Sequence, residues 1–480
     1  MVPEHLRFGG GAADSAISLV VALWLAVAIV LIMVLPRKKV MAPFLLAFFT
    51  IPIEEVVVVG GIHFTALRIL ILAVLARRLT LSRRDKYPGG FNAIDLAVVL
   101  WSVSAVVAFF LEFPDSAALV QGLGVLLDTL GGYLAVRAFI PDGEAMRWTV
   151  KTLAAICVVL GVCMLNEQIT HINVFDRMAG LPTAIQFKNG HFRSQGTLGS
   201  IYAGVFSGVL IPVFIWLWTD KKSRVAAVFG LVGAVLIVYT SYASTSQLAL
   251  LGSVLGLGCW RLRKKMRLIR WAIVAVLVGL QMVMKAPVWA LIARIDLTGS
   301  SSGDQRYHLI DMTIRHFSDW WLIGTPNYVN WGWDSWDLCN QFAAVALTGG
   351  LLTLIFYIAI FKEGFAAIGN ARKRVSGDHK QEWLLWCFGS TLFATVVAHF
   401  GINYMAQLIM GFFPVVACIS VVSFEAKQSA IQSEQSTKKI NFEWAPLVPE
   451  PDAAARDAAP LARGESPQER VGRFTSWLKA

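Results

Sequence analysis

The sequence predicts an all-α polytopic membrane protein with about 13 transmembrane helices. Two observations predict this fold class. Hydrophobic residues make up 56% of the 480 residues and charged residues only 15%, whereas soluble domains average roughly 25% charged residues. The apolar residues also gather into runs near the roughly 20 residues that an α-helix needs to cross a bilayer. We therefore expect lipid to surround most of this chain.

Most of the expected spans are single apolar runs. In chain order these runs cover residues 17–35, 94–110, 118–139, 148–165, 201–218, 225–239, 248–260, 271–283, 342–361, 384–397 and 408–422. Residues 42–75 are too long for one span and contain Pro52 and the Gly60-Gly61 pair, so we expect two short spans that meet at an outer turn. Asp128 lies inside the span 118–139 and should face the bundle interior, with either a structural partner or a functional role.

Lysine and arginine clusters orient these spans. The clusters lie at residues 37–39, 77–86, 221–224, 261–265 and 372–374. An even number of spans, or none, separates each cluster from the next, so all of them lie on one face of the membrane. The positive-inside rule makes that face cytoplasmic, with the N-terminus periplasmic and the C-terminus inside. The net charge of +11 reflects this bias and does not indicate a nucleic-acid partner. The first apolar run has no small-residue cleavage site after it, which predicts an anchor and not a removed signal peptide.

The predicted organisation is one polytopic membrane domain, residues 1–426, followed by a polar cytoplasmic tail, residues 427–480, that we expect to be disordered. Two periplasmic loops are substantial, residues 167–200 and residues 284–341. Loops longer than about 15 residues are uncommon unless they are functional or disordered, and the aromatic content of the larger loop argues against disorder. The larger loop is therefore the first place to look for a site. Within it, a helix capped by Asp304 is expected to run through Phe317.

Metal and disulfide chemistry are poorly supported by the sequence. Five of the six cysteines fall in or beside the expected spans, and no CxxC or HExxH motif is present. We therefore expect no metal ion, no other cofactor and no disulfide framework.

Arginines in the periplasmic loops stand out because the topology rule disfavours positive charge there. A guanidinium binds phosphate oxygens in pairs and keeps its charge, so outer arginines predict an anionic ligand. Arg193 and Arg306 have no carboxylate at helical spacing, which favours this role for both. Arg315 lies four residues from both Asp311 and Asp319, so an ion pair is an equally good interpretation there.

The larger loop also contains aromatic and general-base candidates. Trp320 and Trp321 could form part of a membrane-interface belt, the commoner use of tryptophan at this depth, or a flat platform for a sugar ring or lipid tail. Asp334, Asp337 and His316 are the candidates for a general base, although each could be an ordinary polar loop residue.

Short motifs in these loops occur in an order that resembles the O-antigen ligase and exopolysaccharide polymerase superfamily. The motifs are an R-x-x-G run from Arg193 that opens a span, Arg306-Tyr307-His308 at the head of a helix, Trp320 to Gly324 after it, and Asn340-Gln341-Phe342 entering a helix with Gly349-Gly350. The segment from Leu127-Asp128 through Tyr133 to Arg137 is also similar. The resemblance covers roughly residues 41–422.

The resemblance implies a GT-C-like membrane fold in the bacterial inner membrane. It also implies transfer of glycan from undecaprenyl pyrophosphate to an acceptor hydroxyl in the periplasm, without a metal ion or nucleotide sugar. Arg193 and Arg306 would hold the pyrophosphate. Arg315, Asn340, Trp320 and Trp321 would contribute to substrate binding.

The sequence departs from the family where the base is expected. Many members have His-Asn at the helix after the large loop, whereas this chain has Asp337-Leu338-Cys339-Asn340. Asp337 or His316 would then act as the base. The acceptor could be a growing repeat-unit chain or a lipid, and we favour polymerisation over ligation. Expected partners are the lipid-linked glycan, an acceptor glycan or lipid, membrane lipids, and polysaccharide export and chain-length proteins. A transporter or flippase of lipid-linked glycan would use the same arginines without a base.

Overall fold

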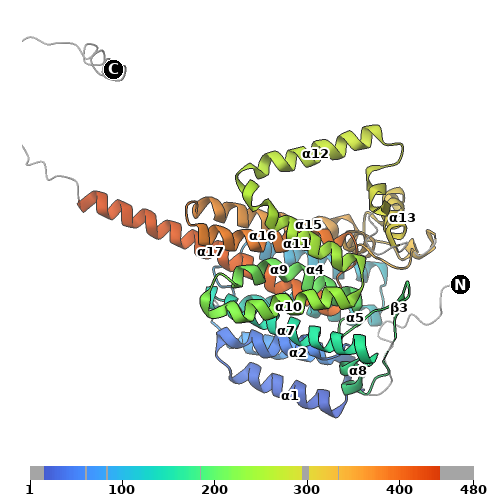
Figure 1. Cartoon of the computed structure of the whole chain (residues 1–480). Coiled ribbons are helices and arrows are strands. Elements are labelled where there is room, and N and C mark those ends of the chain that lie inside the picture. Colours follow the sequence, from blue (N-terminus) through green and yellow to red (C-terminus); the bar gives the residue numbers. More distant parts are fainter. Residues whose placement is uncertain are drawn as a thin grey trace, which may run out of the picture. The chain divides into compact units, whose positions relative to one another are not determined.

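The computed structural model describes residues 16–443 except 60–61, 83–84, 184, 295–301 and 333–334. The chain divides into two compact units, Met1–Ala430 and Ile431–Ala480, and long helices dominate the first (Figure 1). The helices are α1 Leu19–Val34, α2 Met41–Thr50, α3 Ala66–Leu79, α4 Ala93–Glu112, α5 Ser116–Leu126, α6 Gly132–Phe139, α7 Gly143–Thr170, α8 Val174–Ala179, α9 Ser200–Leu217, α10 Arg224–Ser241, α11 Ser244–Gly258, α12 Met266–Val283, α13 Ser302–Arg315, α14 Phe317–Trp320, α15 Gln341–Arg374, α16 His379–His399 and α17 Ala406–Glu443. The strands are β1 Val56–Val59, β2 Ile62–Thr65, β3 Phe187–Lys188 and β4 His191–Phe192.

Eight helices in the described part of the chain are long and apolar enough to cross a membrane. This finding confirms the polytopic membrane class, whereas the predicted count of 13 is not confirmed. One of the eight candidates, Ser244–Val283, covers two predicted spans. The remaining predicted spans correspond to α16 and to helices that are short for a crossing, namely α1, α2 and α3, with 16, 10 and 14 residues.

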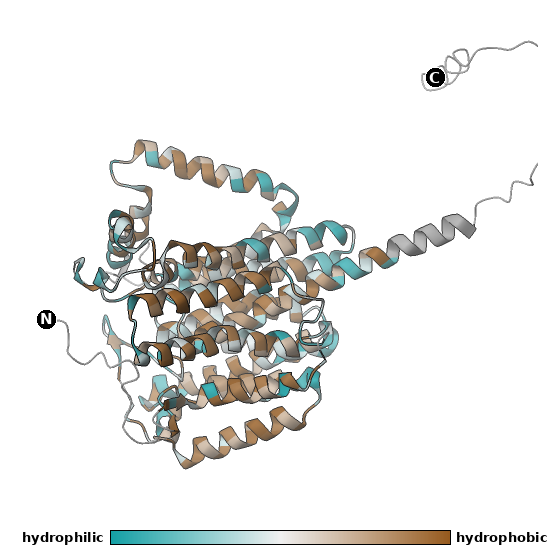
Figure 2. Cartoon of the chain, turned by 180° about the vertical axis from the view of Figure 1, so that it is seen from behind, coloured by the Kyte–Doolittle hydropathy of each residue, from teal (hydrophilic) through white to brown (hydrophobic). Residues whose placement is uncertain are grey.

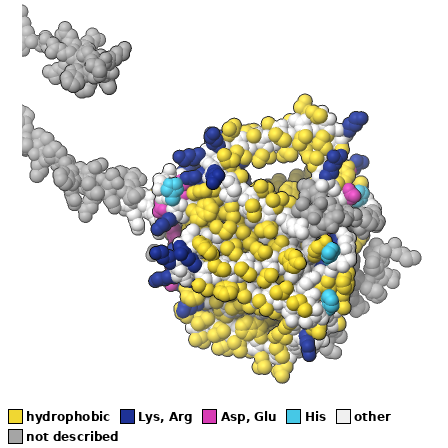
Figure 3. Space-filling model, viewed as in Figure 1, with side chains coloured by type: hydrophobic (Ala, Val, Ile, Leu, Met, Phe, Trp, Pro, Cys, Tyr) yellow, Lys and Arg dark blue, Asp and Glu magenta, His cyan; other side chains and the backbone are white. Residues whose placement is uncertain are grey.

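The helices are apolar along their middles and polar at their ends (Figure 2). Lysines and arginines crowd one end of the bundle, at the left of Figure 3, and we call this the basic end. It carries the connections that contain residues 37–39, 221–224, 261–265 and 372–374. The turn between α10 and α11 and the segments after α12 and α16 belong to the opposite end. No residue of α12 is buried, and this helix stands apart from its neighbours in Figure 1.

Two small hairpins depart from the expected all-α fold. β1 pairs with β2 antiparallel from Val56 opposite Thr65 to Val59 opposite Ile62, and β3 pairs with β4. A run of β-branched valines suits a strand better than a helix, which explains the first hairpin in the interrupted stretch 42–75. Glu55 precedes this hairpin and is buried, and its carboxylate accepts a hydrogen bond from the Ser18 N–H at 2.9 Å.

The start of the predicted tail is also different. Residues 427–443 continue α17, where we expected disorder. This stretch contains no glycine or proline and is rich in residues that tolerate a helix. The rest of the predicted tail, residues 444–480, lies outside the described residues.

A break in α15 locks the larger loop onto the bundle. Gly350 adopts φ 76° inside this helix, and a Cβ added there would lie 2.5 Å from the Leu322 carbonyl oxygen. Gly324 adopts φ 95°, and a Cβ added there would lie 2.4 Å from the Leu347 carbonyl oxygen. Backbone hydrogen bonds of 2.8 Å join Leu351 to Trp321 and Thr325 to Leu347. The two glycines therefore permit a backbone contact that any side chain would prevent.

We expect Gly350→Ala to destabilise the protein by about 1–3 kcal/mol, because alanine must adopt a left-handed backbone and displace the Leu322 carbonyl. Gly369→Ala in the same helix is the matched control, since a Cβ at Gly369 meets nothing within 4 Å. Thermal unfolding of the detergent-purified proteins measures the difference. Equal melting temperatures for the two variants would contradict this interpretation of the break.

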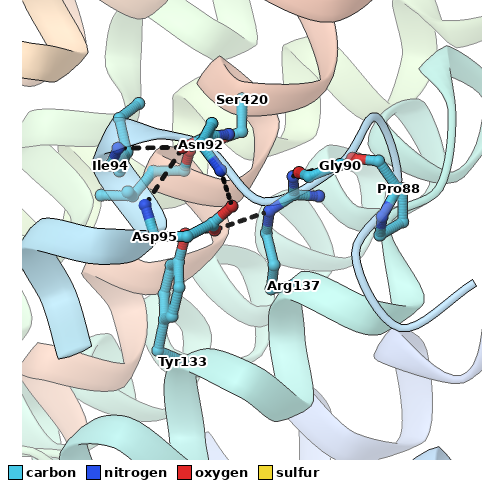
Figure 4. Close-up of polar contacts among 9 residues, drawn as sticks. Pro88, Gly90, Asn92, Ile94, Asp95, Tyr133, Arg137 and Ser420 are labelled. Carbon is cyan, nitrogen blue, oxygen red and sulfur yellow. Dashed lines mark hydrogen bonds and ion pairs between the residues drawn. The ribbon is translucent and has the colours of Figure 1, made fainter. Parts of the chain in front are cut away.

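A fully buried polar cluster joins α4 to α6 (Figure 4). The Arg137 Nε donates to Asp95 Oδ1 at 3.0 Å, and neither side chain is more than 1% exposed. The Tyr133 hydroxyl donates to the same carboxylate oxygen. The Arg137 Nη2 also donates to the carbonyl of Pro88 at 2.8 Å. The segment from 127 to 137 thus includes a structural ion pair at Arg137.

Removing only one partner of this ion pair should destabilise the protein far more than neutralising both partners. We expect Arg137→Met to cost about 3–5 kcal/mol, because it leaves the Asp95 carboxylate buried without its cation. In the double variant with Asp95→Asn, the amide oxygen still accepts from Tyr133 and no charge remains. Thermal unfolding of both proteins tests this, and a double variant as unstable as the single one would contradict it.

Asp128 has a structural partner within the bundle. Its carboxylate accepts two hydrogen bonds of 3.1 Å from the Arg68 Nε and one of 2.8 Å from Nη2. Asp128 lies in a π-helical turn, Leu127–Gly131, that joins α5 to α6. Of the two roles left open by the sequence, the structure provides the ion pair.

Candidate active site

A pocket of about 290 Å³ lies at the end of the bundle opposite the basic end. This volume is at the small end of the roughly 300–1,000 Å³ typical of ligand pockets. Five separate segments line the pocket, and the lining residues are Gln186, Lys188, Arg193, Gly199, Ser200, Ile201, Tyr202, Tyr242, Ala243, Ser244, Thr245, Gln305, Arg306, Asp337, Cys339, Gly401, Ile402 and Asn403. Among these described residues are three cations and one carboxylate, so the lining is positively charged.

Arg193 reaches the pocket from the loop between β4 and α9. Its backbone N–H donates to the Gln186 carbonyl at 2.9 Å, and its Nε donates to the Ser241 carbonyl at 3.1 Å. The side chain is buried, with 8% of the residue exposed. Burial lowers the pKa of Arg193, but a guanidinium stays charged in proteins. A buried, fixed cation therefore faces the pocket.

The R-x-x-G run owes its shape to Glu167 at the end of α7. The Glu167 carboxylate accepts hydrogen bonds from the backbone N–H groups of Gln195 at 2.9 Å and Gly196 at 3.0 Å. Gly196 adopts φ 58°, a left-handed conformation that suits glycine. The Ser194 N–H donates to the Thr240 carbonyl at 3.1 Å. These contacts hold the backbone that follows Arg193 against α7 and α10.

Arg306 enters the same pocket from α13 in the larger loop. Its Nη2 donates to Thr245 Oγ1 at 2.8 Å, and its Nε donates to the Gly401 carbonyl at 3.3 Å. The Thr245 hydroxyl in turn donates to the same Gly401 carbonyl at 3.1 Å. Arg306 is 8% exposed. Both arginines are thus anchored on the short turn from Ser241 to Thr245, although they lie more than a hundred positions apart in the sequence.

Asp337 is the carboxylate of the pocket. It is half-buried, and its Oδ2 accepts a hydrogen bond of 3.2 Å from the Gln305 side-chain amide. Gln305 immediately precedes Arg306 on α13, so one turn of helix positions both the carboxylate and one of the cations. Also in the lining, the Tyr202 hydroxyl donates to the Asn403 side-chain oxygen at 3.1 Å.

Two other charged candidates form local contacts and do not line the pocket. Arg315 pairs with Asp311 at 2.7 Å and its side chain is 66% exposed, which realises the ion-pair interpretation. His316 contacts Asp319 at 3.1 Å through Nδ1, and its ring stacks on Trp331 with centroids 4.4 Å apart. Asp334, the third candidate for a general base, lies outside the described residues.

The remaining candidates support the loop. Trp320 is buried in a small apolar cluster with Leu309 and Leu347, and its Nε1 donates to the Thr313 carbonyl at 2.7 Å. Trp321 is about half exposed. Asn340 is buried and caps α15 by accepting from the Ala343 N–H at 3.1 Å. The structure brings none of the three to the pocket lining.

Sequence reasoning missed several polar residues of the pocket, namely Gln186, Tyr202, Tyr242, Thr245, Gln305 and Asn403. They come from short connections and helix ends, where no local pattern marks them as functional. Lys188 is the one further lining residue that the sequence marks, because it is a basic residue on the face where the topology rule disfavours positive charge. Within the described residues, no group of three or more His, Cys, Asp or Glu side chains is arranged to hold a metal ion.

No protein-family model matches the chain, and no curated protein is significantly similar to it. The family assignment that rests on the short motifs therefore stays a prediction.

Proposed function

We propose that this chain is a metal-independent glycosyltransferase of the bacterial inner membrane that transfers glycan from undecaprenyl pyrophosphate to an acceptor hydroxyl. The reaction takes place on the periplasmic face and extends a surface or exopolysaccharide from its repeat units. The single observation that carries the proposal is the meeting of Arg193, Arg306 and Asp337 in one pocket, from three separate segments.

The arginines suit a pyrophosphate leaving group. When the bond between the anomeric carbon and the pyrophosphate oxygen breaks, negative charge develops on that oxygen. Preorganised cations in a water-poor pocket stabilise such charge strongly, which is often the largest single contribution to catalysis. Arg193 and Arg306 are held by the Ser241 carbonyl and by Thr245 and Gly401, so little reorganisation is needed when the donor binds.

Asp337 suits the role of general base. A carboxylate oxygen accepts the proton of the acceptor hydroxyl as that hydroxyl oxygen attacks the anomeric carbon. The new glycosidic bond forms as the bond to pyrophosphate breaks, which inverts the anomeric configuration. The hydrogen bond from Gln305 to Oδ2 orients the carboxylate at the pocket. Among the two base candidates left open by the sequence, the geometry favours Asp337 over His316, which lies outside the pocket lining.

The orientation of the protein in the membrane follows from the charge pattern. With the basic end in the cytoplasm, the pocket faces the periplasm, the N-terminus is periplasmic and the C-terminus cytoplasmic. The proposal retains about 13 spans and a GT-C-like fold, with α1, α2, α3 and α16 crossing beside the longer helices. Polysaccharide export and chain-length proteins are the partners it implies.

A reconstituted assay tests the proposed function. The purified protein in proteoliposomes is supplied with the lipid-linked repeat unit extracted from the host membrane. We expect longer glycan on the lipid, with release of undecaprenyl pyrophosphate. Transfer of glycan to a different lipid acceptor would indicate a ligase. Movement of the intact lipid between leaflets without bond formation would indicate a transporter and would overturn the proposal.

A further inference from the structure

The turn between α10 and α11 holds both arginines of the pocket, and one aromatic side chain lies between its two anchoring points. The Ser241 carbonyl accepts from Arg193 at 3.1 Å, and Thr245 Oγ1 accepts from Arg306 at 2.8 Å. Tyr242 directly follows the first of these residues and lines the pocket. An anion that contacted both guanidinium groups would therefore lie in the same pocket as this ring.

Tyr242 adopts an unusual backbone conformation for its residue type. Its φ of 41° and ψ of 51° lie in the left-handed region, where a bulky residue is strained and glycine or asparagine is relaxed. Only two other non-glycine residues in the described part of the chain, His171 and Asn189, have a positive φ. A strained residue at a pocket is a reason to ask what its side chain does there.

The Tyr242 ring is held in place by His191. The two rings stack with centroids 4.1 Å apart and an angle of 28° between their planes. His191 belongs to β4, two residues before Arg193, so the hairpin that delivers the arginine also fixes the ring. Tyr242 is half-buried, whereas His191 is exposed. The aromatic pair thus lies on the same two segments that carry and anchor Arg193.

Polar side chains suited to hydroxyl groups line the same pocket as this ring. The pocket lining includes Gln186, Gln305, Asn403 and Tyr202, which supply amide and hydroxyl groups without further charge. Sugar rings present an apolar face of C–H groups and a rim of hydroxyls. A pocket lined by both an aromatic ring and amide groups complements both parts, because a few polar groups fix the orientation of the bound sugar.

We propose that Tyr242, stacked on His191, is the binding platform for the first sugar of the donor, the pyranose ring joined directly to the pyrophosphate. This inference rests on the proposed function and assigns a sugar subsite to it. The pyrophosphate contacts Arg193 and Arg306, and the first sugar packs against the Tyr242 ring. Tyr242 then contributes to recognition of glycan, and the arginines contribute to recognition of the lipid pyrophosphate.

Binding measurements with two lipids separate these contributions. The full-length protein in nanodiscs is titrated with undecaprenyl pyrophosphate and with the same lipid carrying the repeat unit from the host. Tyr242→Asn removes the ring and is compatible with a positive φ, and Tyr242→Phe retains the ring. We expect Tyr242→Asn to weaken binding of the glycan-bearing lipid about five- to tenfold and to leave undecaprenyl pyrophosphate unchanged. Tyr242→Phe should bind both lipids within about twofold of the original protein.

A matched variant on the cation side completes the experiment. Arg193→Lys should weaken the binding of both lipids, because both carry the pyrophosphate that this arginine contacts. Suppose that Tyr242→Asn weakens binding of both lipids equally, or of neither, while Arg193→Lys behaves as expected. The sugar platform is then overturned and the proposed function stands. If the original protein binds neither lipid, the proposed function fails and the platform fails with it. Thermal unfolding of each variant confirms that a loss of binding reflects the site and not the fold.

Discussion

Alanine at Arg193 or Arg306 is expected to abolish polymer in cells that lack the original gene copy and to lower the reconstituted transfer rate about 10²–10³-fold. Each guanidinium is buried and held by hydrogen bonds at the pocket, so its loss removes a preorganised charge from the site. Lysine at either position should give an intermediate rate, because it restores the charge without the planar fork that grips two phosphate oxygens.

Arg315→Ala is the matched control for these variants. Arg315 lies in the same loop as Arg306, but its side chain is 66% exposed and pairs with Asp311 outside the pocket lining. We expect normal polymer and a transfer rate within about twofold, since an exposed ion pair contributes little. Polymer length is measured on gels and protein amount by membrane immunoblot. Loss of activity in Arg315→Ala with normal activity in Arg193→Ala would place the anion site elsewhere.

Asp337→Asn is expected to lower the transfer rate about 10²–10⁴-fold while the donor lipid still binds. The asparagine oxygen can accept the hydrogen bond that Gln305 now donates to Oδ2, so the local geometry is preserved. What is lost is the ability to take a proton from the acceptor hydroxyl. Initial rates in proteoliposomes and donor affinity in nanodiscs separate the chemical step from binding.

His316→Ala distinguishes the two bases that the sequence leaves open. His316 contacts Asp319 and Trp331 and does not line the pocket, so its removal should leave the chemical step intact. An inactive His316→Ala protein beside an active Asp337→Asn protein would reverse the assignment of the base.

The sequence was informative about this site wherever a residue departed from a general rule. Arg193 and Arg306 are noticeable because they lie on a face that should be poor in positive charge. Asp337 is noticeable because it precedes a span at the place where the resembled family has its base. The structure then brings all three to one pocket, which no local pattern could establish for residues so far apart along the chain.

Other features depend on contacts that sequence patterns do not encode. The partner of Asp128 is Arg68, sixty positions away. In the sequence, nothing distinguishes Gly350 from other glycines of membrane helices. Its role follows from its close approach to the Leu322 carbonyl oxygen. Tyr242 lies in a stretch rich in serine and threonine that no motif marks, and its significance comes from a positive φ and from its position beside the anchors of both arginines. Such features arise from backbone geometry and from pairing between distant segments.

The most direct test of the central claim is an experimental structure of the protein in nanodiscs loaded with undecaprenyl pyrophosphate that carries the repeat unit from the host. We predict pyrophosphate density in the pocket, with oxygens about 2.7–2.9 Å from the guanidinium nitrogens of both Arg193 and Arg306, and with Asp337 beside the anomeric position. Density for the pyrophosphate against Arg315, or on the basic end of the bundle, would contradict the assignment of this pocket as the donor site.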